Sequence, residues 1–161
     1  LSPVLPSIYI VCATPYVRSR TNVSQRNTLR LNIIVVLPGM PDSRREFGTS
    51  VEKAVAEYLE KKGFRILEHQ YQSPFGEIDL VCQDGDEVVF VEVKARQTST
   101  FGYPEESVTR QKLSHITKCG QSYIKTRSSN TQWRIDVVAV EFLPKVRITH
   151  LKAIDIPDSV W

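Results

Sequence analysis

The chain has 161 residues, of which 41% are hydrophobic and 24% are charged, and its formal net charge at pH 7 is +3. This composition is typical of a soluble globular protein with one ordinary domain, and no apolar run reaches the roughly 18 residues of a membrane-spanning helix. The first 39 residues hold four basic residues and no acidic one, so 17 of the 21 basic residues remain to balance 18 acidic ones. Residues 40–161, the body of the protein, are therefore nearly neutral. The positive charge of the whole chain is then no evidence that the protein binds nucleic acid.

Residues 1–39 form an N-terminal extension with a composition of its own, and the single methionine of the chain, Met40, follows them directly. We interpret Met40 as the natural first residue and the extension as translated upstream sequence or a disordered segment, and we leave it out of fold reasoning. An Arg-rich, acid-free segment is also typical of a transit peptide, so that alternative stays open. Residues 40–161 then form one domain.

The three cysteines, Cys12, Cys82 and Cys119, form no CxxC pair, and no histidine lies at the spacing of zinc ligands. This pattern predicts neither a structural zinc ion nor a disulfide framework, and it favours a protein of the reducing cytoplasm.

Two amphipathic helices and five strands predict an α/β fold. Thr49 and Glu52 have the spacing of a capping box at the start of the first helix, and Gly63 ends it. Pro104 opens a helical turn, and a second helix follows over 109–126. Strands are predicted over 64–68, 77–83, 88–94, 133–142 and 145–151. The order αβββαββ makes a mixed central sheet flanked by helices.

Charged residues share one face of the hairpin predicted over 77–94. Glu92 and Lys94 alternate with valines, so they lie on one side of their strand. Asp84-Gly85 is a strong hairpin signal, and the loop length decides whether Asp79 joins them, because directly opposed residues point the same way. A two-residue turn at Asp84-Gly85 opposes Asp79 to Phe90 and Glu77 to Glu92, and a four-residue loop opposes Asp79 to Glu92. A three-residue loop turns Asp79 away. The site hypothesis therefore predicts a loop of even length.

Two carboxylates that converge on a half-buried surface repel each other and need a cation. Lys94 supplies one charge, and oxygen ligands without thiolate or imidazole suit Mg²⁺ or Mn²⁺. Such an ion polarises a phosphodiester and lowers the pKa of bound water, while Lys94 orients the water or steadies the phosphate, which predicts hydrolytic P–O cleavage. The alternative is an ordinary strand ion pair of Glu92 and Lys94 without chemistry, and Glu52 is explained by its capping box alone.

The residues that carry these signals resemble a known family. The matching motifs are Gly76-Glu-Ile-Asp-Leu-Val81, Val89-Phe-Val-Glu-Val-Lys-Ala-Arg96, Phe101-Gly-Tyr-Pro104, Lys112 and Arg134-Ile-Asp-Val-Val138. Together they are similar to the YraN-like family of small bacterial proteins, over essentially Phe47 to Ile154. That family is similar to archaeal Holliday-junction resolvases and belongs to the PD-(D/E)xK nuclease superfamily, whose fold is restriction-endonuclease-like with an αβββαβ core.

The resemblance implies a role for each site residue. Asp79 and Glu92 would be metal ligands, Lys94 the catalytic lysine, and Glu52 the helix carboxylate often found near such sites. It also implies branched DNA as the substrate and a homodimer as the assembly.

A basic segment without acids runs from Ser107 to Thr131. Arg110 and Lys112, in the first turns of the second helix, could meet a phosphate with the help of the helix dipole, and Arg96 lies two residues beyond Lys94 on the same strand face. The alternative is a solvated polar helix face. The Arg134 and Asp136 pair is interpreted as a structural salt bridge.

These features lead to two hypotheses. The first is a Mg²⁺-dependent deoxyribonuclease that acts on branched or repair-intermediate DNA. The second is a non-catalytic nucleic-acid-binding or assembly module that retains the nuclease fold, which the near-neutral body favours.

Overall fold

The computed structural model describes residues 9–11, 15–16, 28–32, 34–36, 44–96, 108–127, 131–142 and 146–156, with the backbone alone for the strands before residue 44, for Arg44 and for Arg96. No helix in these ranges is long and apolar enough to cross a membrane. The elements, in chain order, are β1 (Tyr9–Val11), β2 (Pro15–Tyr16), β3 (Thr28–Asn32), β4 (Ile34–Val36), α1 (Arg44–Lys61), β5 (Arg65–Ser73), β6 (Gly76–Asp84), β7 (Glu87–Arg96), α2 (Arg110–Lys125), β8 (Trp133–Glu141) and β9 (Arg147–Leu151).

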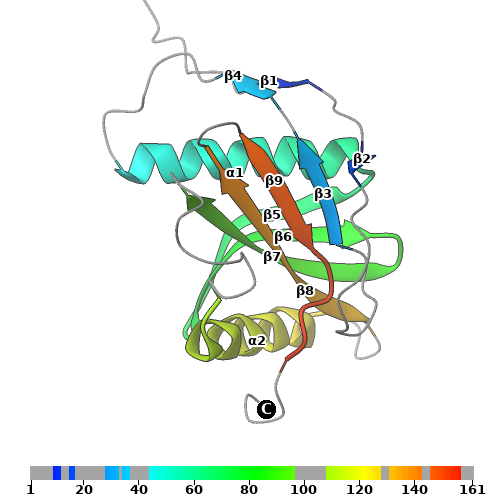
Figure 1. Cartoon of the computed structure of the whole chain (residues 1–161). Helices are drawn as coiled ribbons and strands as arrows, with labels where there is room; N and C mark the ends of the chain where they lie inside the picture. The colour runs from blue at the N-terminus through cyan, green and yellow to red at the C-terminus, as the bar shows by residue number, and fades with distance from the viewer. Residues whose placement is uncertain are drawn as a thin grey trace, which may run out of the picture.

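One mixed sheet forms the centre of the fold (Figure 1), with the strand order β2-β3-β9-β8-β7-β6-β5. β5, β6 and β7 form an antiparallel meander, β7 and β8 are parallel, and α2 makes the crossover between them. The expected α/β class and the restriction-endonuclease-like αβββαβ core, with a mixed sheet flanked by helices, are confirmed.

The N-terminal extension contributes strands that sequence reasoning did not anticipate. β3 pairs antiparallel with β9 over five residue pairs, from Thr28 opposite Leu151 to Asn32 opposite Arg147. β1 and β4 form a separate two-stranded sheet. The origin of the extension, as upstream sequence or transit peptide, stays a prediction.

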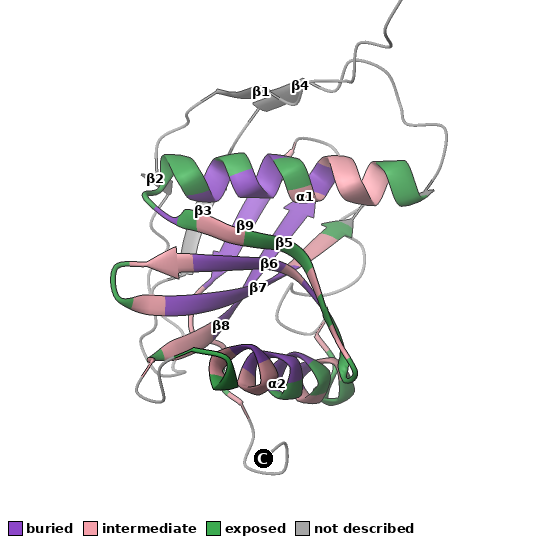
Figure 2. Ribbon diagram, turned by 180° about the vertical axis from the view of Figure 1, so that it is seen from behind, coloured by how far each residue is buried: buried purple, intermediate pink, exposed green. Residues whose placement is uncertain are grey.

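Each helix covers its own face of the sheet, as Figure 2 shows from behind. Side chains of α1 such as Val55 and Leu59 pack with Val89 and Val91 of β7. Side chains of α2 such as Ile116 pack with Phe90, the residue between those valines. Because successive strand residues point to opposite faces, the alternation along β7 places Glu92 and Lys94 on the α2 side.

The start of the first helix differs from the expectation. α1 begins at Arg44, and Thr49 lies inside it with its hydroxyl donating to the carbonyl oxygen of Arg45 at 3.1 Å. The capping-box assignment of Thr49 and Glu52 is therefore wrong, since a helical threonine can bond its own preceding turn instead of starting a helix. The predicted end at Gly63 is confirmed, because this residue has a φ of 89° and the amide of Phe64 bonds the carbonyl of Leu59 at 3.0 Å.

The other boundaries agree closely with the pattern-based expectations. α2 is capped by Thr109, whose hydroxyl accepts from the Lys112 amide at 3.2 Å. β5 extends five residues beyond the predicted strand, to Ser73, because its polar second half is held by pairing with β6 rather than by burial. Cys82 and Cys119 are buried free thiols. Cys12, Met40, Phe101 and Pro104 lie outside the described residues.

Candidate metal and nuclease site

The hairpin loop has the even length that the site requires. Gln83 opposes Val88 and Asp84 opposes Glu87, so the loop consists of Gly85 and Asp86. Gly85 alone in this loop has a positive φ, 60°, which is the feature of a type II′ turn. The turn is shifted by one residue from the predicted Asp84-Gly85, and the resulting register, continued to the next positions, sets Asp79 directly opposite Glu92.

Asp79 lies where β6 and β7 stop pairing. The last paired residues are Leu80 and Val91, and β6 continues beyond this point in its pairing with β5. The Oδ2 atom of Asp79 accepts a hydrogen bond from the backbone amide of Val93 at 2.7 Å. The carboxylate thus satisfies an amide that the diverging ladder leaves open, and it is held at the split between the two strands.

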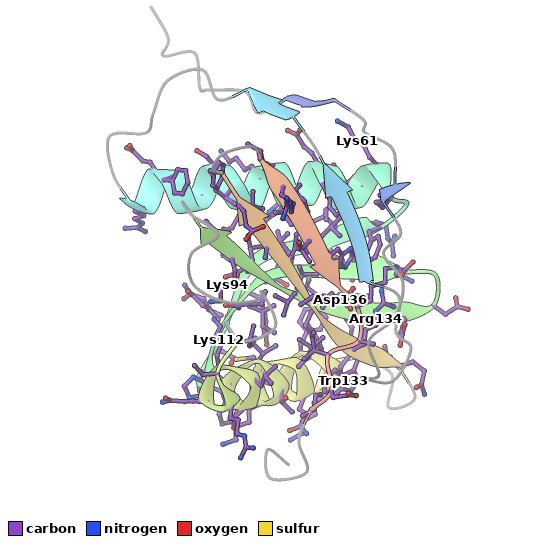
Figure 3. The ribbon with its side chains drawn as sticks, in the orientation of Figure 1. Lys61, Lys94, Lys112, Trp133, Arg134 and Asp136 are labelled. Atoms are coloured by element: carbon purple, nitrogen blue, oxygen red, sulfur yellow. The ribbon has the colours of Figure 1, made fainter. Side chains whose placement is uncertain are left out.

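Glu92 is a buried carboxylate held between two lysines. Its side chain is 2% exposed, Lys94 Nζ lies 2.6 Å from Oε1, and Lys112 Nζ lies 3.0 Å from Oε2. Figure 3 shows Lys94 on β7 and Lys112 on α2 on the same side of the sheet. Oε2 has no hydrogen-bond donor in good alignment, yet the interaction with Glu92 outweighs burial and raises the pKa of Lys112.

The two carboxylates influence each other strongly. Burial and the negative charge of Glu92 raise the pKa of Asp79 from 3.8 to about 7, although the Val93 amide and Lys112 act in the opposite direction. A raised pKa from a like charge is the electrostatic sign of two carboxylates that share a site. Together with the register of β6 and β7, this interaction places Asp79 and Glu92 near each other, while their role as a metal site stays a prediction.

Glu52 is brought to the same region from α1. Its Oε2 atom accepts a hydrogen bond from Gln70 Nε2 at 3.0 Å. Burial raises the pKa of Glu52, the Gln70 bond opposes that rise, and the charges of Glu77 and Glu92 add to it. The negative charge of Glu52 in turn adds to burial and the charge of Glu92, which raise the pKa of Asp79.

Sequence reasoning missed two features of the site. Gln70, the partner of Glu52, has a φ of 50°, which is uncommon for a residue other than glycine. No sequence signal marks Gln70, because its role depends on the bend of β5. The sequence predicted that Lys112 binds phosphate, whereas in the structure its ammonium contacts the Glu92 carboxylate. The first turn of α2 has no acidic residue, and this was the one sequence signal that Lys112 needs an anionic partner from elsewhere in the fold.

The donor set fits a hard divalent cation. Within the described ranges, no three His, Cys, Asp or Glu side chains gather closely enough to hold a metal ion by themselves. Mg²⁺ sites commonly use one or two carboxylates and complete their shell with water and substrate phosphate. Asp79 and Glu92 meet that need, and the poorly satisfied Oε2 atom of Glu92 is a buried acceptor that such an ion would satisfy.

The residues predicted to bind nucleic acid lie on α2 or beside the site. Arg110 is exposed at the start of α2, and Lys112 is 29% exposed in the same turn. α2 carries no acidic residue, and its outward positions include His115, Lys118 and Lys125. The side chain of Arg96 lies outside the described residues.

A second charged cluster is structural. Arg134 is 13% exposed and binds Asp84 at 2.7 Å, Asp136 at 3.0 Å and the carboxylate of Glu87. Asp136 is fully buried and also lies 3.0 Å from His150 Nε2, while the Ala153 amide donates to it at 2.8 Å. Every oxygen of Asp136 is bonded, which agrees with the interpretation of this pair as a salt bridge.

Comparisons with known proteins show the family. The profile of "Uncharacterised protein family UPF0102" matches residues 51–140. A UPF0102 protein of Clostridioides difficile is 43% identical over 110 residues, which are 68% of this chain and 96% of that protein. One of Pelotomaculum thermopropionicum is 41% identical over 114 residues, 70% of this chain and 95% of that protein.

Among solved structures, SfsA of Pyrococcus furiosus in complex with Ca²⁺ is 13% identical and aligns over 90% of this chain and 75% of its own. The TM-score of 0.33 is too low to establish a common fold. The matched range includes Asp79 and Glu92, and the chain belongs to the UPF0102 family, the YraN-like family that its motifs resemble.

Proposed function

We propose that this protein is a divalent-metal-dependent nuclease that hydrolyses DNA phosphodiesters, with branched or repair-intermediate DNA as its substrate. The observation that carries the proposal is the pair of carboxylates at the split between β6 and β7, where Glu92 is 2% exposed and the pKa of Asp79 is raised to about 7. A buried like-charged pair is costly unless a cation compensates it.

Asp79 and Glu92 would hold Mg²⁺ or Mn²⁺, which would polarise the phosphate and lower the pKa of bound water. Lys94, 2.6 Å from Glu92, would orient the attacking water or stabilise the charge that develops on phosphate. Glu52 lies on α1, the helix on the other face of the sheet from α2, and its carboxylate would position water. We assign the protein to the cytoplasm because Cys82 and Cys119 are free thiols.

The nucleic acid would approach along the acid-free helix α2, where Arg110 and Lys112 would contact backbone phosphates, with Arg96 on the adjoining strand. Phe75 is 49% exposed in the turn between β5 and β6, four residues before Asp79. An exposed ring stacks readily on an unpaired base, which supports a substrate with unpaired or branched regions. A homodimer would present two such sites to one branched DNA molecule.

One observation favours a second candidate, a nucleic-acid-binding or assembly module without turnover. Lys94 and Lys112 already neutralise Glu92 without any metal ion. A site balanced in this way can persist for structural reasons alone.

An endonuclease assay separates the two candidates. The full chain is incubated with single-stranded, duplex, flap and four-way DNA in the presence of Mg²⁺, Mn²⁺ or a chelator, beside Glu92→Gln, Lys94→Met and the control Glu57→Gln, an exposed residue of α1. We expect metal-dependent cleavage by the wild type and the control, and a loss of about 100-fold or more in the two site variants. Cleavage that survives either site substitution would refute the mechanism, and binding without cleavage under every metal condition would favour the module.

A further inference from the structure

Glu92 sits between two cations that come from different elements of the fold. Lys94 is two residues away on the same strand, while Lys112 reaches Glu92 from the first turn of α2. With Asp79 ionised, Lys94 and Lys112 balance the charges of Asp79 and Glu92, and Glu52 and Glu77 add negative charge from their surroundings. A divalent ion bound to Asp79 and Glu92 would repel the two ammonium groups and weaken the attraction that holds them at Glu92, so its binding favours the departure of one of them.

The two lysines differ in how easily they can leave. The ammonium of Lys94 makes the shorter contact, 2.6 Å from Oε1, against 3.0 Å between Lys112 and Oε2. Oε2 also receives no well-aligned hydrogen bond, so the Lys112 contact has less directional strength. The two side chains are similarly exposed, 32% for Lys94 and 29% for Lys112, and both stems are flexible, so the longer contact of Lys112 is what distinguishes it.

The surroundings of Lys112 favour an anion as its second partner. α2 has no acidic residue in its first turn, and Arg110 is exposed beside Lys112. The amides of a helix N-terminus add partial positive charge at the same place. Glu77 also attracts the Lys112 ammonium, and a backbone phosphate of a bound nucleic acid would compete with it for the ammonium that leaves Glu92.

We propose that Lys112 is an exchangeable counterion, which neutralises Glu92 in the metal-free protein and transfers to a nucleic-acid phosphate when a divalent ion binds Asp79 and Glu92. Metal and nucleic acid would then each strengthen the binding of the other, because either one stabilises the released position of Lys112. This inference rests on the proposed metal site, and it gives Lys112 a positioning and coupling role rather than a purely structural one.

The sign of one measurement distinguishes this role from a structural ion pair. If Lys112 competes with the metal, Lys112→Gln removes the competitor and tightens metal binding. If Lys112 only fastens α2 to β7, its removal loosens the site and weakens metal binding. Lys112→Arg retains the competing charge and should behave like the wild type, and Lys118→Gln removes the same charge from an exposed position of the same helix.

The experiment is calorimetric titration of the full-length variants with Mn²⁺, alone and in the presence of a cleavage-resistant phosphorothioate DNA duplex, with circular dichroism to confirm folding. Without DNA we expect Lys112→Gln to bind Mn²⁺ about fivefold more tightly than the wild type, as loss of a partly exposed competing ion pair would produce. We expect the two other variants to stay within about twofold of the wild type. DNA should increase the Mn²⁺ affinity of the wild type by about fivefold or more and that of Lys112→Gln by less.

Weaker Mn²⁺ binding by Lys112→Gln, equal tightening in Lys118→Gln, or no Mn²⁺ binding by any variant would overturn the inference. Failure of the nuclease proposal alone would give a different result. Mn²⁺ and DNA would bind with the predicted coupling, but the cleavage assay would show no product.

Discussion

Replacement of Asp79 by asparagine should stabilise the metal-free protein, although it removes a proposed metal ligand. Asparagine has nearly the same shape, and its side-chain oxygen can still accept the bond from the Val93 amide, which Asp79 receives at 2.7 Å. What the substitution removes is a negative charge that burial and Glu92 both disfavour.

The size of the effect follows from the pKa of Asp79. Its value is 3.8 ordinarily and about 7 in the folded protein. Because the folded state binds this proton more tightly than the unfolded state does, ionisation of Asp79 opposes folding, and the wild type loses stability as the pH rises from about 4 to about 7. At 1.36 kcal/mol for each pKa unit, the difference corresponds to about 4 kcal/mol above pH 7, and solvent around this part-buried group lowers the expected gain to about 2–4 kcal/mol.

The assay is urea unfolding of the metal-free protein in a chelator, followed by circular dichroism at about pH 5 and about pH 8 and extrapolated to water. Asp86→Asn is the control, because it makes the same chemical change at an exposed loop residue of the same hairpin. We expect the advantage of Asp79→Asn over the wild type to grow between the two pH values, while the control stays within about 0.5 kcal/mol at both. An advantage that shrinks toward high pH, or an equal gain in the control, would refute the reasoning about Asp79.

Three further predictions follow from the same structure. Since a proton on Asp79 competes with the metal, the affinity for Mn²⁺ should rise about tenfold per pH unit up to about pH 7 and then level off, and a profile without this bend would contradict the assignment. Gly120→Ala should destabilise the fold by about 1–3 kcal/mol, because the new Cβ would lie 2.5 Å from the buried ring of Phe90, whereas Gly48→Ala in α1 meets nothing within 4 Å and should stabilise it by up to about 1 kcal/mol in thermal or urea unfolding. Arg134→Met should cost about 3 kcal/mol in the same experiment, because buried Asp136 loses a guanidinium at 3.0 Å, and a cost below about 1 kcal/mol would show that the cluster is not needed for folding.

Local signals predicted much of the fold because the elements concerned are decided by short-range chemistry. Gly63 ends α1 because only glycine adopts its backbone conformation without strain, and Thr109 caps α2 through its own hydroxyl. The same kind of signal failed at Thr49, where a threonine and a later glutamate have capping spacing inside a helix that starts five residues earlier. Capping residues indicate a helix start only where the chain before them is not helical, and no local pattern reveals that.

The candidate site shows the same division. Alternation along β7 was enough to place Glu92 and Lys94 on one face, and the even loop that brings Asp79 to them followed from that requirement. The partners of these residues come from distant parts of the chain. Lys112 reaches Glu92 from the crossover helix α2, and Gln70 of the edge strand β5 donates a hydrogen bond to Glu52.

The sequence by itself determined the family, the order of the elements from α1 onward and the face of the hairpin that carries charge, because these depend on residue types at fixed short spacings. Only the tertiary structure decided how that charge is balanced. The divergence of β6 from β7 opens the ladder at Val93 for Asp79, and the packing of α2 on the same face brings the Lys112 ammonium to within 3.0 Å of Glu92. Electrostatic energies depend on the distance between charged groups and on their burial, and both are set only when the helices pack on the sheet.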